Sequence, residues 1–203
     1  MTDGANFNSI LYMIQQTLNR VSTNTLVEVV SFIPNPGGGL LAGTVNVQPL
    51  INQVADTGAP VPHGVLAALP YFRIQAGNSA IVVDPVAGDI GMAAFCDHDI
   101  SSVIANKAQS NPGSFRRFDM SDGIYFGAVG NVNGAPTQFI EMLAAAGGIN
   151  ITTPATATIN AGGKTFTFGS AGFTMSDGIV AETHQHTYTP GSGSPTTTSG
   201  PVA

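Results

Sequence analysis

The sequence carries very little charge. Asp, Glu, Lys and Arg make up 9% of its 203 residues, whereas about 25% is ordinary for a soluble domain. No apolar run approaches the roughly 18 residues that a membrane-spanning helix needs. A chain with 43% hydrophobic residues, little charge and no membrane span must hide much of its surface. Obligate oligomerisation is the simplest way to do so.

Basic residues are equally scarce, and this excludes two classes of partner. The six Lys and Arg residues are scattered along a chain of formal net charge −6. Neither nucleic acid nor an anionic lipid surface is therefore an expected electrostatic partner. The N-terminus, Met-Thr-Asp-Gly, lacks the basic and apolar pattern of a signal peptide. We expect synthesis in the cytoplasm without export by a signal peptide.

Cysteine occurs once, at Cys96, which excludes an intrachain disulfide. Its neighbours are Phe95 and Asp97. This setting predicts a small buried residue rather than a reactive thiol.

The first hundred residues predict a helix followed by a small barrel. Apolar residues recur at helical spacing within residues 7–21, where Asn6 or Asn8 is the expected cap, so residues 1–21 form an N-terminal helix. Residues 22–105 then alternate short β-like runs with turn residues, which indicates a five-stranded OB-fold-like barrel. The expected strands are Thr25–Ile33, Leu41–Ile51, Tyr71–Gln75, Ala80–Val83 and Gly91–Phe95.

Residues 106–130 are expected to connect the barrel to a second domain. Arg116 and Arg117 stand here, close to Asp119 and Asp122. One interpretation is a capped turn with local ion pairs. The other is that the arginines attach the barrel to the next domain or to a neighbouring chain.

Charge almost vanishes after Gly130, and apolar residues begin to alternate with Thr and Asn. The charged residues beyond that point are Glu141, Lys164, Asp177 and Glu182. Because each short strand has one narrow apolar face, a single chain could not make a core from them. Three chains wound together over residues 131–189 would form a closed β-helix without free edges. A monomeric β-sandwich is the alternative, and residues 190–203 read as a flexible or folded-back tail.

Two histidines stand close to the C-terminus, as His184 and His186. In a strand, residues i and i+2 point to the same face, so both imidazoles leave the backbone in one direction. Three chains would supply six imidazoles, an octahedral set that fits Fe or Ni better than Zn. Such a filled site is structural, because no position stays open for a substrate. Glu182 shares their phase, so its carboxylate either accepts a hydrogen bond from an imidazole N–H or faces solvent, and it is not expected to be a ligand.

A rival cluster, Asp97-His98-Asp99, invites a general-base interpretation. Adjacent strand residues point to opposite faces, and no nucleophile elbow, P-loop or zinc-protease motif accompanies the cluster. A small hydrolase using Asp97 and His98, with His63 nearby, remains an alternative function.

Taken in order, these features resemble the central spike proteins of contractile-tailed bacteriophages, which pierce the host membrane from the tail baseplate. The resemblance covers the helix, the barrel, the connector Arg116–Gly123, the charge-poor β segment and the terminal His184–His186 pair. It implies an all-β fold: an N-terminal helix and an OB-fold barrel, followed by an intertwined trimeric β-helix needle. A lysozyme-like insertion is not seen.

The resemblance also implies partners, a cofactor and a location. It implies a homotrimer with one structural iron ion, held by His184 and His186 of three chains. It implies a virion protein below the tail tube and hub proteins of the baseplate, which punctures the host outer membrane without enzyme activity. A trimeric receptor-binding adhesin or tail-fibre module is the first alternative function, ahead of the hydrolase, because it would share the β-rich, Thr-rich and Gly-rich composition.

Overall fold

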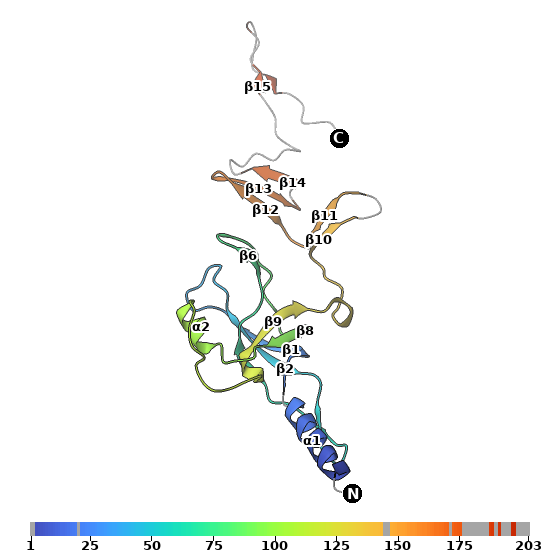
Figure 1. Cartoon of the computed structure of the whole chain (residues 1–203). Helices are drawn as coiled ribbons and strands as arrows, with labels where there is room; N and C mark the ends of the chain where they lie inside the picture. The colour runs from blue at the N-terminus through green and yellow to red at the C-terminus, as the bar shows by residue number, and fades with distance from the viewer. Residues whose placement is uncertain are drawn as a thin grey trace. The chain divides into compact units, whose positions relative to one another are not determined.

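The computed structural model describes residues 3–19, 21–143, 147–170, 172–175, 187–188, 191 and 196–197. The chain divides into two compact units, residues 1–134 and 135–203. The predicted all-β class is confirmed: one longer helix precedes a succession of short strands (Figure 1). No helix among the described residues is long and apolar enough to cross a membrane.

The first unit opens with helix α1 (Asp3–Leu18) and contains nine strands, one short helix and two 3-10 turns. In chain order these are β1 (Asn24–Ile33), β2 (Thr44–Pro49), β3 (Gln53–Val54), β4 (Pro60–Val61), β5 (Leu66–Leu69), β6 (Ile74–Ala76), β7 (Ser79–Ile81), β8 (Ile90–Phe95), α2 (Ser101–Asn106), η1 (Met120–Asp122), β9 (Gly123–Ala128) and η2 (Gly130–Val132).

Five of these strands form one curled antiparallel sheet in the order β5-β2-β1-β8-β9 (Figure 1). The two ends of the sheet meet where β5 runs into Tyr71. The Tyr125 amide donates to the Pro70 carbonyl at 2.9 Å, and the Phe72 amide donates to the Tyr125 carbonyl at 2.7 Å. These bonds satisfy backbone groups that an open sheet edge would leave unpaired. The OB-fold-like barrel is thereby closed by its own chain.

The barrel core follows from strict alternation along the strands. In β2 every second residue is buried, and the same holds for the centre of β1. Seven side chains of the core are no more than 1% exposed: Val27, Val29, Val45, Val47, Leu69, Ala93 and Tyr125. Gly91 makes room for the largest of them, because a Cβ there would lie 2.5 Å from the Tyr125 hydroxyl. This core gives the first unit a stable interior within one chain.

Predicted and observed elements differ at several positions. Helix α1 begins at Asp3, so Asn6 and Asn8 lie inside it and the predicted caps were wrong. The acidic Asp3 in the first turn suits the helix dipole, but the apolar spacing from which the helix was predicted does not extend to this residue. Strand β5 was missed because its Leu-Ala-Ala-Leu sequence is poor in β-branched residues. The expected strand at Tyr71–Gln75 is an isolated bridge at Tyr71 followed by β6.

The segment 106–130, expected as a connector, contains β9. This strand pairs with β8 through Phe95–Gly123 and Ala93–Tyr125. The last barrel strand thus follows the arginine-rich turn rather than preceding it. The predicted domain boundaries stay predictions.

The second unit contains short antiparallel hairpins. Strands β10 (Phe139–Met142) and β11 (Ile149–Thr152) form one sheet. Strands β12 (Ala157–Ala161), β13 (Lys164–Gly169) and β14 (Gly172–Met175) form a second, and β15 (Thr187–Tyr188) pairs with β16 (Thr196–Thr197). The alternation predicted after Gly130 is confirmed in these strands, while a β-helix is a matter for proposal.

Candidate functional site

The predicted metal ligands His184 and His186 lie outside the described residues, as does Glu182. The other two histidines, His63 and His98, line separate surface depressions. Within the described part of the chain, no group of three or more His, Cys, Asp or Glu side chains is placed to hold a metal ion. The metal site therefore stays a prediction from the sequence.

The sheet β12-β13-β14 has one apolar face. Directly opposite residues in antiparallel strands share a face, and the pairs Ile159–Phe166, Phe166–Met175 and Phe168–Phe173 lie on it. The Phe173 ring stacks on those of Phe166 and Phe168, with centroids 5.9 and 4.9 Å apart. The reverse face carries polar residues, namely Thr158, Asn160, Thr165, Thr167 and Thr174.

The β10-β11 hairpin repeats this division. Ile140 pairs with Ile151 and Met142 with Ile149 on one face. On the other face the Asn150 amide donates to the Glu141 carboxylate at 3.4 Å. The β10-β11 hairpin and the β12-β13-β14 sheet thus each have one apolar face, and their opposite faces are mainly polar.

These apolar faces are uncovered in the single chain. The residues on them that lie furthest into solvent are 47–79% exposed: Ile140, Met142, Ile149, Ile151, Ile159 and Phe168. Natural monomers rarely leave contiguous apolar surface of this kind in water. We define these six residues as the apolar strip of the second unit. Its exposure is the most informative functional feature among the described residues.

The catalytic alternative meets only part of its geometry. His98 Nδ1 lies 2.9 Å from an Asp97 carboxylate oxygen, so the imidazole does have an adjacent acid. The pair is open to solvent, because the His98 side chain is 44% exposed and that of Asp97 is 65% exposed. The third member, Asp99, is engaged elsewhere. A candidate base without a nucleophile or an enclosed site is a weak catalytic arrangement.

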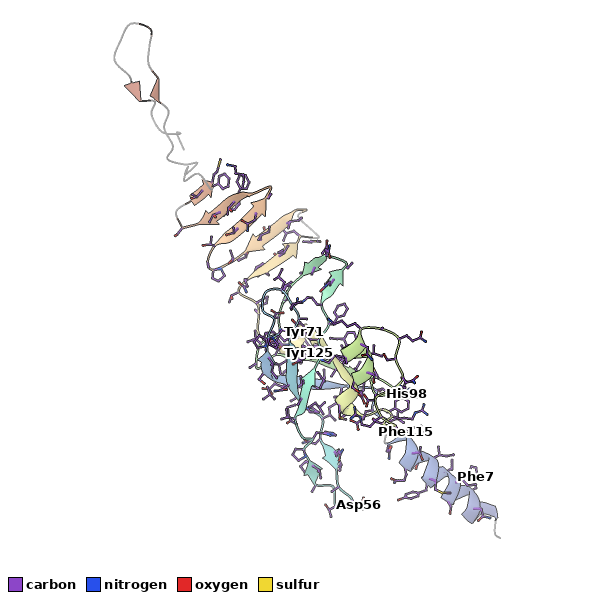
Figure 2. All side chains as sticks on the ribbon, turned by 90° about the vertical axis from the view of Figure 1, so that its left-hand side faces the viewer. Phe7, Asp56, Tyr71, His98, Phe115 and Tyr125 are labelled. Carbon is purple, nitrogen blue, oxygen red and sulfur yellow. The ribbon has the colours of Figure 1, made fainter. Side chains whose placement is uncertain are left out.

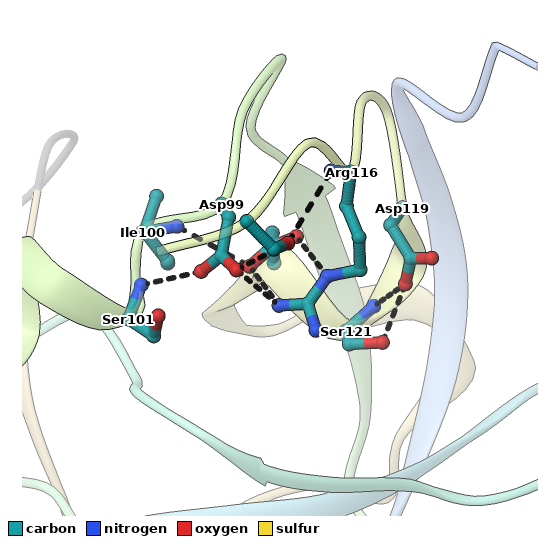
Figure 3. Close-up of polar contacts among 8 residues, drawn as sticks. Asp99, Ile100, Ser101, Arg116, Asp119 and Ser121 are labelled. Carbon is teal, nitrogen blue, oxygen red and sulfur yellow. Dashed lines mark hydrogen bonds and ion pairs between the residues drawn. The ribbon is translucent and has the colours of Figure 1, made fainter. Parts of the chain in front are cut away.

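Asp99, Arg116 and Asp122 form an ionic network in which both carboxylates are buried and the Arg116 side chain is 43% exposed. Figure 3 shows Asp99 and Arg116 in this network. The Arg116 guanidinium donates to Asp122 at 3.0 and 3.2 Å and lies 3.1 Å from Asp99. Asp99 also accepts from the Ser101 amide at 2.9 Å and the Ser114 hydroxyl at 2.7 Å. Hydrogen bonds from Ser101 and Ser114, together with the charge of Arg116, lower the pKa of Asp99 to about 2.

This network settles the interpretation of the arginine-rich turn. Asp119 caps η1 by accepting from the Ser121 amide at 2.8 Å. Arg116 satisfies two carboxylates that are 2–5% exposed as residues, Asp122 and Asp99. The prediction of a capped turn with local ion pairs is confirmed for Arg116. Its function is to fix the chain between β8 and β9.

A second polar cluster was not foreseen from the sequence. Arg73 donates to the Asp84 carboxylate at 2.6 Å, to the Leu40 carbonyl at 2.6 Å and to the Tyr71 hydroxyl, which in turn donates to Asp84. Burial and the hydrogen bond to Asp84 raise the pKa of Tyr71. The types and the spacing of these residues match no sequence motif. Arg73 and Asp84 lie just before and just after the β6-β7 hairpin, so the turn of this hairpin brings them together.

A cleft of about 280 Å³ lies beside this cluster. Figure 2 shows Tyr71 and Tyr125 next to each other in the barrel at this place. Burial, and the negative charge of Asp89, raise the pKa of Tyr125 to about 12. Stacked Phe72 and Phe126, with centroids 5.7 Å apart, form an apolar wall. Two carboxylates line the cleft: Asp84, which accepts from Tyr71 and Arg73, and Asp89, which accepts from the Val86 amide at 2.8 Å.

Comparison with known families identifies the barrel. Residues 27–128, half of the chain, match the model of the phage protein Gp138 N-terminal domain. The chain belongs to this family. The Gp138 match runs from β1 to the end of β9, so it coincides with the strands of the closed barrel. A search of curated proteins found no match.

Membership of the Gp138 family bears out the broader part of the sequence prediction. The chain is a phage protein. This finding supports the prediction of a structural role in the virion and is consistent with the prediction that the protein is not an enzyme. The family match ends before β10 and so does not include the second unit.

Proposed function

We propose that this protein is the central spike of a contractile phage tail baseplate, in which three copies wind their second units into a needle. The apolar strip of the second unit carries the proposal. A closed barrel needs no help to bury its core, whereas the residues that the structure describes leave the strip uncovered. A phage virion protein with such a strip is suited to self-assembly.

Threefold winding is the arrangement that the strand pattern supports. Each strand offers two or three apolar residues on one face, and such a short hairpin is too small for an independent core. Three copies around an axis would cover one another's strips and leave the Thr and Asn faces to water. Winding would also pair the free strand edges, which are an aggregation hazard in weakly charged sheets.

We propose that the tip is closed by an iron ion held by His184 and His186 of all three copies. The support is the chemistry of the donor set, because six imidazoles suit Fe or Ni and disfavour four-coordinate Zn. The ion would supply cross-linking of the three chains and no reaction. Since the separated chains lack the full site, the bound metal would stabilise the trimer.

The proposed action is mechanical. Contraction of the tail sheath drives the needle, attached below the tube and hub proteins, through the host outer membrane. A slender body with little charge crosses hydrocarbon at low electrostatic cost, because burying ions is what makes crossing expensive. The barrel, with its own core, would hold the needle to the baseplate under load.

Location on the phage particle tests this function against the adhesin alternative. Antibodies against the chain, detected by gold labelling in electron microscopy of contracted phage particles, should mark the distal end of the tail tube on its axis. Label on the fibre tips would overturn the spike and favour the receptor-binding module.

The metal requires its own test. Elemental analysis by mass spectrometry of purified, untagged protein should give one iron per three chains. The His184→Ala/His186→Ala double variant should lose the iron, whereas Gln185→Ala, between the two ligands, should keep it. Iron retained in the double variant would overturn the tip site.

A further inference from the structure

We infer that helix α1 forms a parallel three-helix bundle with the α1 helices of two other copies. The inference rests on the proposed trimer and adds an interface at the end of the chain opposite to the needle. It follows from the exposure of the helix, its spacing of apolar residues and its lack of charge.

Helix α1 buries none of its apolar side chains within its own chain. Every side chain from Asn6 to Asn19 is exposed. The large apolar ones, from Phe7 to Leu18, are 42–62% exposed, whereas those of the barrel core lie near zero. A helix of 16 residues is marginal in water unless its apolar face packs against a partner. A partner outside this chain is therefore expected.

The spacing of its apolar residues identifies the kind of partner. Phe7, Leu11, Ile14 and Leu18 recur at intervals of four, three and four residues, which is the a and d pattern of a coiled coil. We call these four residues the α1 seam. Leu11 and Leu18 occupy a positions, and Ile14 occupies a d position. Leu at a with Ile at d favours bundles of three or four helices over two.

Charge argues against other partners. No charged residue occurs between Asp3 and Arg20. An amphipathic helix that lies on a membrane carries Lys and Arg on its polar face, and α1 has none there. Identical helices in parallel register also bring like charges together, so an uncharged helix suits a symmetric bundle. The seam thus fits a second and third copy of itself best.

The bundle would depend on the rest of the trimer. Two heptads are short for an independent coiled coil, but joining the chains elsewhere raises the local concentration of the helices. We therefore expect the second units to join the three chains first and the α1 helices to associate afterwards.

Site-specific cross-linking of the full-length protein tests the inference. In a Cys96→Ser background, Ile14→Cys places a thiol in the seam, and Gln16→Cys places one two residues away on the outer side of the helix. A short bifunctional maleimide should yield covalent dimers in denaturing gels with Ile14→Cys and not with Gln16→Cys. Adding Leu11→Asp should abolish the product, whereas adding Met13→Asp, an apolar residue outside the seam, should leave it.

Sedimentation of the same samples separates the two levels of the account. A trimer without cross-linking at Ile14→Cys would overturn the bundle and leave the spike intact. Equal cross-linking at both positions would also overturn it, because the contact would then not follow the seam. A monomer without cross-linking would overturn the proposed trimer together with the bundle. Circular dichroism checks that each variant keeps its barrel.

Discussion

The two units of this chain bury apolar residues in opposite ways. In the barrel, Val27, Val45 and Val47 are completely buried among neighbours from the same chain. In the second unit, Ile140 and Met142 stand 70% and 79% exposed although they alternate as regularly as the barrel residues. Regular alternation therefore fixes which face of a strand is apolar, but not which chain covers it. The barrel buries its core within one chain, whereas the described part of the second unit leaves its apolar strip exposed.

The largest expected effect comes from placing charge in the apolar strip. Ile159→Asp should convert the assembly to monomers, because one carboxylate per copy would be buried without a partner. Thr158→Asp changes the opposite, polar face of the same strand and should leave the trimer intact. Analytical ultracentrifugation measures both. Equal sedimentation of Ile159→Asp and the unaltered chain would contradict the role of the strip.

A cavity in the barrel should act differently. Leu69→Ala removes a side chain that is 1% exposed and should lower the free energy of unfolding by about 2–5 kcal/mol. The loss is expected at every protein concentration, because the core lies within one chain. Leu40→Ala, at a position 79% exposed, should change stability by no more than about 0.5 kcal/mol. Denaturant titrations at two protein concentrations make the comparison.

A smaller effect is expected from acid, and it should fall on the barrel. The pKa of Asp99 is about 2 in the folded protein, below its ordinary value of 3.8. A lowered folded pKa contributes stability above the unfolded pKa, and that contribution is lost as pH falls from about 4 to about 2. Asp99→Asn should be less stable at neutral pH and should lose less stability across this window. Thermal unfolding from pH 5 to pH 2 measures both slopes.

If Asp99→Asn kept the full slope of the unaltered chain, the acid sensitivity would belong to other carboxylates. Asp119→Asn is the comparison variant from the same turn, because the pKa of Asp119 is lowered first by the hydrogen bonds that it accepts from Ser121 and only secondarily by the charge of Arg116.

The smallest expected effect is local to one hairpin of the second unit. Gly162 and Gly163 join β12 to β13 with φ of +57° and +77°, the geometry of a tight two-residue turn. Gly162→Ala meets no atoms but must adopt positive φ, which costs roughly 1 kcal/mol. Gly64→Ala, which also meets open space at ordinary φ, should be neutral. A melting temperature equal for both variants would contradict the turn assignment.

The sequence predicted those parts of the fold in which local pattern and burial agree. The strands β12 to β14 follow from the alternation of apolar and polar residues along each strand, which places Ile159, Phe166 and Phe168 on one face. Strands β5 and β9 did not emerge, because Leu-Ala-Ala-Leu has a weak β signal and β9 is defined by its long-range pairing with β8. Tertiary pairing decides such segments.

The candidate site shows the same division. Asp119 and Ser121 lie close in sequence, so a capped turn was predictable. The contact between Asp99 and Arg116 forms because the chain turns back after α2, and no local sequence pattern predicts this turn. The Arg73–Asp84 pair likewise requires the β6-β7 hairpin. The predicted ligands His184 and His186 lie outside the described residues, and their role rests on spacing and residue type.

Native mass spectrometry of the full-length, untagged protein tests the central claim most directly, because it reports chain stoichiometry and bound metal together. The account predicts an assembly of three 20.7 kDa chains carrying one iron ion. A monomer without metal at micromolar concentration would contradict it, since the apolar strip would then stand in water without a partner chain.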